Sequence, residues 1–185
     1  MRADARKNRD HLLAVAGTAI AEQGVDVALR DIARRADVGL ATLLRHFPTR
    51  EALLDALLRT GFDELTAQAC ALETSSTPGD ALVSWLRDAV AWTTRYRGAT
   101  ALMAAAIQDT ESALHASCVA LRAAGARLLT RAQAADVARN DIDGADLFAL
   151  VAMLAWLGDQ PALAPRADRL FDVVSGAVLQ STTTP

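Results

Sequence analysis

Apolar residues recur at intervals of three and four along most of the chain, the spacing that places side chains on one face of an α-helix. The first run predicts a helix over residues 6–23, ended by Gly24 as a left-handed C′ residue. Two short periodic runs follow over 29–35 and 40–46, with a break at Asp37. We expect a tight turn here, because aspartate tolerates the left-handed backbone that such a turn requires.

A longer apolar-periodic run begins after Pro48 and predicts a connector helix from about Arg50 to Glu73, with Thr49 as its N-cap. Beyond Pro78-Gly79 the pattern predicts helices near 79–97, 99–108, 111–135, 144–157 and 166–180. The chain is therefore expected to be all-α. Its predicted units are an N-terminal helix-turn-helix domain over 1–49, a connector helix and linker over 50–77, and a C-terminal helical domain over 78–185.

Composition agrees with a helical core and locates the positive charge. Of the 185 residues, 52% are hydrophobic but only 4% aromatic, which disfavours a β architecture. The net charge is −3, yet residues 1–50 carry nine Lys/Arg against six Asp/Glu, a net of +3. A polyanion should therefore meet the N-terminal part. With no signal-like or membrane-length apolar run, we expect a cytoplasmic protein that does not enter a membrane.

The segment 29–48 has the packing requirements of a helix-turn-helix. Ala33 is small where the two short helices must cross closely. The residues expected to form the apolar wedge between the two helices are Ile32, Ala36, Val38 and Leu43. Phe47 is expected to join the same small core.

The run from Arg45 to Leu53, Arg-His-Phe-Pro-Thr-Arg-Glu-Ala-Leu, resembles the signature of the TetR family of transcriptional regulators. Ile32-Ala33, Ala36-Asp37-Val38 and Thr42-Leu43 add to the resemblance, which covers residues 10–60. It implies a recognition helix beginning at Gly39 or Leu40. It also implies a C-terminal domain that dimerises and holds a small-molecule effector. Carried over by position, contacts with double-stranded operator DNA fall to Arg30, Ala41, Thr42, Leu44, Arg45, His46 and Arg50.

Two positions depart from the family pattern. Leu44 stands where a tyrosine is usual, and Ala28 stands where a hydroxyl residue usually caps the second helix.

Bulky residues in the C-terminal half are candidates for the walls of a ligand cavity. Trp85, Trp92 and Tyr96 share one face of the helix near 79–97. The full set of candidate ligand-binding residues is Trp85, Trp92, Tyr96, Met103, Gln108, His115, Met153 and Trp156. The alternative for each apolar member is ordinary core packing, which is the commoner reason for an aromatic stripe.

No catalytic constellation is found. His115 and Cys118 stand three apart on a predicted helix, as half of a metal site or a Cys/His nucleophile would require. No second ligand pair or orienting acid has a matching spacing, so a packed cysteine beside a polar histidine is the preferred interpretation. Cys70 and Cys118 are both expected to be small buried thiols. We predict no enzyme activity, no metal and no cofactor.

The last two predicted helices carry apolar residues, including Leu154 and Val174, on more than one face. That is more than packing within one subunit needs, so a homodimer is expected. The leading hypothesis is a dimeric repressor that a small, largely apolar effector releases from a palindromic operator. The alternative is a helical ligand-binding or protein-interaction module whose DNA-reading surface has decayed, as Leu44 suggests. An enzyme using His115 and Cys118 is the third hypothesis.

Overall fold

The computed structural model describes residues 2–96, 109–112 and 114–179, and side chains from residue 6 onward. The helix expected over 99–108, with Met103 and Gln108, lies outside these ranges. The described helices are α1 (Arg2–Gln23), α2 (Leu29–Arg35), α3 (Leu40–His46), α4 (Arg50–Leu72), α5 (Pro78–Arg95), α7 (His115–Ala134), α8 (Gly144–Asp159), the short 3-10 helix η1 (Ala164–Arg166) and α9 (Ala167–Val178). Within the described ranges, extended pairing is limited to one isolated bridge between Ala138 and Leu179.

The turns of the N-terminal part form as their residues predict. Gly24 ends α1 at a φ of 87°, and Asp37 takes a φ of 54° between α2 and α3. The Thr49 hydroxyl accepts a hydrogen bond from the backbone N–H of Ala52 at 3.1 Å and caps α4. The N-cap of α2, Ala28, provides no side-chain hydrogen bond. The bounds of α2 and α3 match the sequence prediction.

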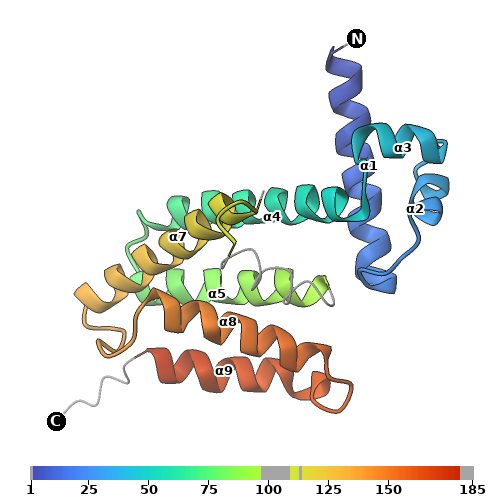
Figure 1. Cartoon of the computed structure of the whole chain (residues 1–185). Helices are drawn as coiled ribbons and strands as arrows, with labels where there is room; N and C mark the ends of the chain where they lie inside the picture. The colour runs from blue at the N-terminus through green and yellow to red at the C-terminus, as the bar shows by residue number, and fades with distance from the viewer. Residues whose placement is uncertain (1, 97–108, 113, 180–185) are drawn as a thin grey trace.

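The N-terminal helices share one apolar core. Ile32 and Leu43, from the two helices of the motif, are almost fully buried, as is Phe47 just after α3. They belong to the same buried cluster as Leu12 and Ile20 of α1. An ion pair of 2.6 Å between Arg35 and Glu22 fastens α2 to α1. In Figure 1, α1, α2 and α3 form a unit at one end of α4, and α4 runs from it into the remaining helices.

The C-terminal helices pack around Trp85 of α5. Its Nε1 donates a hydrogen bond to the carbonyl of Leu65 in α4 at 3.0 Å. A Cβ on Gly125 of α7 would come within 2.5 Å of the Trp85 ring, so glycine is needed for this approach of α5 and α7. These helices form the core of the C-terminal domain, and α8 completes it.

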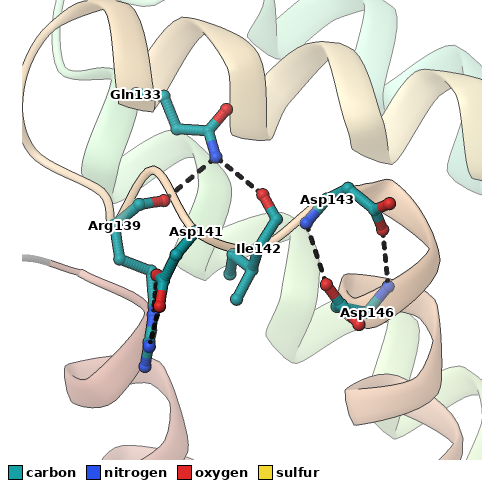
Figure 2. Close-up of polar contacts among 6 residues, drawn as sticks. All are labelled: Gln133, Arg139, Asp141, Ile142, Asp143 and Asp146. Carbon is teal, nitrogen blue, oxygen red and sulfur yellow. Dashed lines mark hydrogen bonds and ion pairs between the residues drawn. The ribbon is translucent and has the colours of Figure 1, made fainter.

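The connection between α7 and α8 is held by its own polar groups (Figure 2). The Gln133 side-chain nitrogen donates hydrogen bonds to the carbonyls of Arg139 at 3.0 Å and Ile142 at 2.9 Å. Arg139 also makes two bonds of 2.6 Å with the Asp141 carboxylate. Asp143 and Asp146 then form a reciprocal capping box at the start of α8. This connection has few degrees of freedom.

Helices α8 and α9 lie side by side, and part of their apolar surface is open (Figure 1). Met153 and Trp156 of α8 and Val173 of α9 are 43%, 53% and 62% exposed. Leu154 is buried and Val174 half-buried within the subunit. In the described part of the chain, no helix combines the length and the apolar character needed to cross a bilayer.

Three sequence expectations need correction. The first helix begins at Arg2 rather than at residue 6. Helix α7 begins at His115 rather than at 111, because the Asp109 carboxylate accepts from the Glu111 N–H and its carbonyl accepts from the Ser112 N–H, which makes a turn there. Cys70 is exposed on α4 and is not buried, whereas Cys118 is buried as expected.

Candidate DNA interface and ligand pocket

Helix α3 buries Leu43 and turns Ala41 and Arg45 to the opposite side. Ala41 and Arg45 are exposed, and Thr42 and His46 are half-buried. The Arg45 Nη2 donates a hydrogen bond to the Thr42 hydroxyl at 3.1 Å. A guanidinium and a hydroxyl held together on an exposed helix face have the hydrogen-bonding groups needed to contact base edges in a major groove.

Leu44 is partly withdrawn from this surface. It is half-buried and packs against the apolar core. Its contribution to an interface would therefore be a small apolar contact rather than the hydrogen bond that a tyrosine hydroxyl could make.

The arginines near the motif differ in their availability. Arg34 pairs with Asp31 at 2.9 Å, and Arg35 pairs with Glu22. Arg30 and Arg45 are exposed and form no ion pair with another residue of the described ranges. The positive charge of these two side chains is therefore free to meet phosphate.

Arg50 has an internal contact that sequence reasoning missed. It is the first residue of α4, and its Nη1 donates to the carbonyls of Val25 at 2.8 Å and Val27 at 2.6 Å. These carbonyls lie in the segment between α1 and α2, so Arg50 fixes the entry to the helix-turn-helix. Its contact with a DNA phosphate stays a prediction.

A pocket of about 600 Å³ lies between α1, α4 and the C-terminal end of α5. Its lining includes apolar side chains, among them Leu13, Leu57, Trp92 and Tyr96. Gly17 of α1 and Gly61 of α4 contribute backbone surface to the same lining. One wall of the pocket therefore comes from α1, which packs against the helix-turn-helix, and another comes from α5 of the C-terminal domain.

The structure brings only some of the candidate ligand-binding residues to this pocket. Trp92 and Tyr96 line it. Trp85, in contrast, is enclosed in the core between α4 and α7. Met153 and Trp156 are on the open face of α8, and His115 is half-buried at the start of α7.

The two aromatic rings of the pocket are closely positioned. The centroids of Trp92 and Tyr96 are 4.9 Å apart in an edge-to-face arrangement, and Phe62 lies 5.2 Å from Trp92. A Cβ on Gly61 would come within 2.2 Å of the Trp92 ring. Burial raises the pKa of Tyr96, partly offset by the nearby positive charge of Arg95, so its hydroxyl stays protonated at neutral pH.

Sequence reasoning missed the role of these glycines. Glycine in a helix interior lowers helix stability, so its presence indicates a close approach. Gly17 and Gly61 lie inside α1 and α4, and this was the available signal for the pocket.

The structure does not support a catalytic or metal-binding role for the His115 and Cys118 pair. Burial raises the pKa of the Cys118 thiol to about 11, which keeps it from forming a nucleophilic thiolate at neutral pH. Within the described ranges there is no group of three or more His, Cys, Asp or Glu side chains placed to hold a metal ion.

Comparison with known families gives two matches. The profile for bacterial regulatory proteins of the tetR family matches residues 12–57. The profile for the SbtR-like C-terminal domain of transcriptional regulators matches residues 77–176. Together they cover most of the chain. No curated protein matches it.

Solved structures agree with these matches. The TetR transcriptional regulator SCO0520 from Streptomyces coelicolor is 33% identical, with 94% of this chain and 99% of that one covered and a TM-score of 0.71. A TetR transcription regulatory protein from Mycobacterium vanbaalenii is 31% identical, with 97% and 99% covered and a TM-score of 0.69. NemR of E. coli in its reduced form shares the fold at 12% identity, with 96% and 100% covered and a TM-score of 0.68.

Proposed function

Because the chain belongs to the TetR family of bacterial transcriptional regulators, we propose that it is a homodimeric repressor that releases its operator when it binds a small molecule. Members of this family are DNA-binding regulators and not enzymes. The observation that supports the operator role is the exposed face of α3, where Thr42 and Arg45 are held together by a hydrogen bond.

We assign the interface residues by their position on the motif. Thr42 and Arg45 read base edges in the major groove, because they are the polar side chains that α3 presents. Arg30 and Arg50 neutralise phosphates on either side of the groove. Ala41, Leu44 and His46 complete the contact surface of α3.

The open apolar surface of α8 and α9 supports the homodimer. Met153, Trp156 and Val173 are exposed large apolar side chains on these two adjacent helices. A two-fold dimer would place the two recognition helices in successive major grooves about 34–36 Å apart, so the operator should be an inverted repeat. Because its target is DNA, we place the protein in the cytoplasm.

Effector release follows from linkage between two sites. A small molecule that prefers the dimer with wrongly spaced recognition helices lowers DNA affinity, and DNA lowers its affinity by the same factor. The helix α5, which carries Trp85, Trp92 and Tyr96, is the proposed location of the effector. Helix α4 connects this region to the DNA-binding domain.

The test is selection of genomic fragments with the purified protein, followed by footprinting of the selected DNA. We expect an inverted repeat. Arg45→Ala and Thr42→Ala should each relax preference at defined base pairs by about 1–3 kcal/mol. Arg166→Ala, a matched exposed arginine in η1, should change nothing. Absence of DNA binding even at low salt would contradict the repressor and favour a module with a decayed DNA-reading surface.

A further inference from the structure

We propose that the pocket between α1, α4 and α5 is an effector site that spans both domains, and that its occupant is an uncharged, flat aromatic molecule carrying a carbonyl group. The regulatory part of this proposal rests on the proposed repressor function. The binding part stands on the pocket alone.

The shape of the pocket favours a flat occupant. The lining combines the aromatic rings of Trp92 and Tyr96 with backbone surface at Gly17 of α1 and Gly61 of α4, and the Trp92 ring packs directly on Gly61. A Cβ on Gly17 would come within 3.3 Å of Leu57 and 3.5 Å of the Tyr96 hydroxyl. A volume of about 600 Å³ is that of a site for a small organic molecule.

The Tyr96 hydroxyl identifies the polar group that the occupant should carry. Tyr96 as a whole is only 8% exposed, and its hydroxyl forms no hydrogen bond with any residue of the described ranges. The hydroxyl oxygen is not among the fully enclosed polar atoms of those ranges that lack a partner, so it keeps surface open to the pocket. This hydroxyl lies close to Gly17 and faces the pocket, and it stays protonated at neutral pH, so it can donate to a ligand carbonyl.

The charges around the pocket favour an uncharged occupant. Two basic residues, Arg9 and Arg95, and three acidic residues, Asp10, Glu22 and Glu64, share its lining. Both signs are present on α1, and Glu64 of α4 faces the same pocket as Arg95 of α5. The field of one sign is largely cancelled by the other, so neither an anion nor a cation gains strongly there.

The wall formed by α1 gives the occupant a direct route to the recognition helix. The Arg9 guanidinium lines the pocket and lies 5.2 Å from the centre of the Phe47 ring, immediately after α3. Glu22, at the other end of the pocket, pairs with Arg35 of α2. A molecule that separates α1 from α5 must therefore move the helix-turn-helix with α1.

Photolabelling with benzophenone, an uncharged aromatic ketone, tests the location in the full chain. On irradiation, we expect labelled peptides from α1, within residues 9–22, together with peptides from α4 or α5. Excess Nile red, a flat uncharged dye with a carbonyl, should suppress the label. Labelling confined to α7, α8 or α9 would overturn the proposal.

Nile red fluorescence titrations test the chemistry. Ala14→Trp fills the pocket from an exposed position on α1 and should weaken binding about 10-fold or more. The matched control Ala67→Trp, exposed on α4 away from the pocket, should bind as the wild type does. Tyr96→Phe should weaken binding about 3- to 10-fold because one hydrogen bond is lost. Unchanged binding in Ala14→Trp, or no binding to the wild type, would overturn the proposal.

DNA binding measured without any dye separates the two proposals. If the protein binds no DNA but Nile red binding depends on Ala14 and Tyr96, the repressor function fails and the site stands. If DNA binds and the dye is insensitive to both variants, the site fails and the repressor function stands. If both stand, Nile red should lower operator affinity by the factor by which operator lowers Nile red affinity.

Discussion

Arg50 is expected to act twice, once inside the protein and once on DNA. Its Nη1 donates two hydrogen bonds to backbone carbonyls between α1 and α2, while the rest of the half-buried guanidinium can face a phosphate. The informative change is Arg50→Met, which keeps much of the apolar stem and removes every donor. The internal role predicts a loss of folding stability, and the DNA role predicts a loss of DNA affinity, so the two can be measured separately.

The internal loss can be estimated from the contacts. A hydrogen bond that involves a charged group contributes about 1.5–3 kcal/mol. Both bonds of Arg50 come from one nitrogen in a partly exposed position, so they are not independent. We therefore expect Arg50→Met to lower the free energy of unfolding by about 2–3 kcal/mol.

Urea unfolding measures this loss. It is done at a fixed protein concentration, because the stability of the proposed dimer would depend on concentration. Arg59→Met is the matched control. Arg59 is exposed on the same helix and forms no hydrogen bond with the residues that the structure describes, so this change should leave stability within about 0.5 kcal/mol of the wild type. A fully stable Arg50→Met would refute the structural role of the two carbonyl contacts.

The DNA loss is measured by the dependence of operator affinity on salt. Removal of one phosphate contact should reduce the slope of log K against log salt by about 0.9 and weaken all sequences to a similar degree. An unchanged slope together with lower stability would refute the phosphate contact and leave the internal role standing.

Three further predictions follow from exposure and from pKa. Val173→Asp should give monomers in sedimentation experiments, whereas Val119→Asp, at another exposed valine on α7, should leave the proposed dimer intact; dimers of both variants would refute the α8–α9 interface. With a disulfide reagent at neutral pH, Cys70 should react quickly and Cys118 only on unfolding, because burial raises the pKa of Cys118 to about 11; fast reaction of both thiols in the folded protein would contradict this. The backbone N–H of Glu51 itself and the N-cap hydroxyl of Thr49 lower the pKa of the Glu51 carboxyl. The ionised Glu51 carboxylate should therefore stabilise the fold above the ordinary pKa of a glutamate, and this stabilisation should be lost as the pH falls through the lowered pKa of Glu51. The unfolding free energies of Glu51→Gln and wild type should differ at neutral pH and converge in acid. A difference that persists in acid would contradict the assignment.

The helix-turn-helix was predictable because its signals are local. Asp37 supplies the left-handed turn, Gly24 ends the preceding helix and Thr49 caps the following one, and each acts within a few residues of its own position. The start of α7 was misplaced by a few residues. The Asp109 carboxylate makes the turn with the Glu111 N–H, but its continuation to His115 depends on backbone hydrogen bonds, from the Ser112 N–H to Asp109 and from the His115 N–H to Ser112.

The ligand pocket was predictable only in part. Helical periodicity predicts which residues share one face of a helix, but it does not predict which other helix packs against that face. Trp85 and Trp92 share a face of α5, yet Trp85 packs on Gly125 of α7 while Trp92 packs on Gly61 of α4 beside the pocket. Both rings meet a glycine of another helix, so which of them borders a cavity depends on how the surrounding helices pack, and those helices are far away in the sequence. Arg50 shows the same limit, since its carbonyl partners are more than twenty residues away.

The loop between α7 and α8 depends on the side-chain amide of Gln133. Its side-chain nitrogen lies 3.0 and 2.9 Å from two carbonyl oxygens, so conversion of that amide to a carboxylate would replace two attractive contacts by repulsion between oxygens. Deamidation at this one position would change a single group and add almost no volume. It would nevertheless release the connection that sets where α8 begins, and with it the helix proposed to meet the second subunit. The chemical ageing of one amide would thus weaken the proposed dimer.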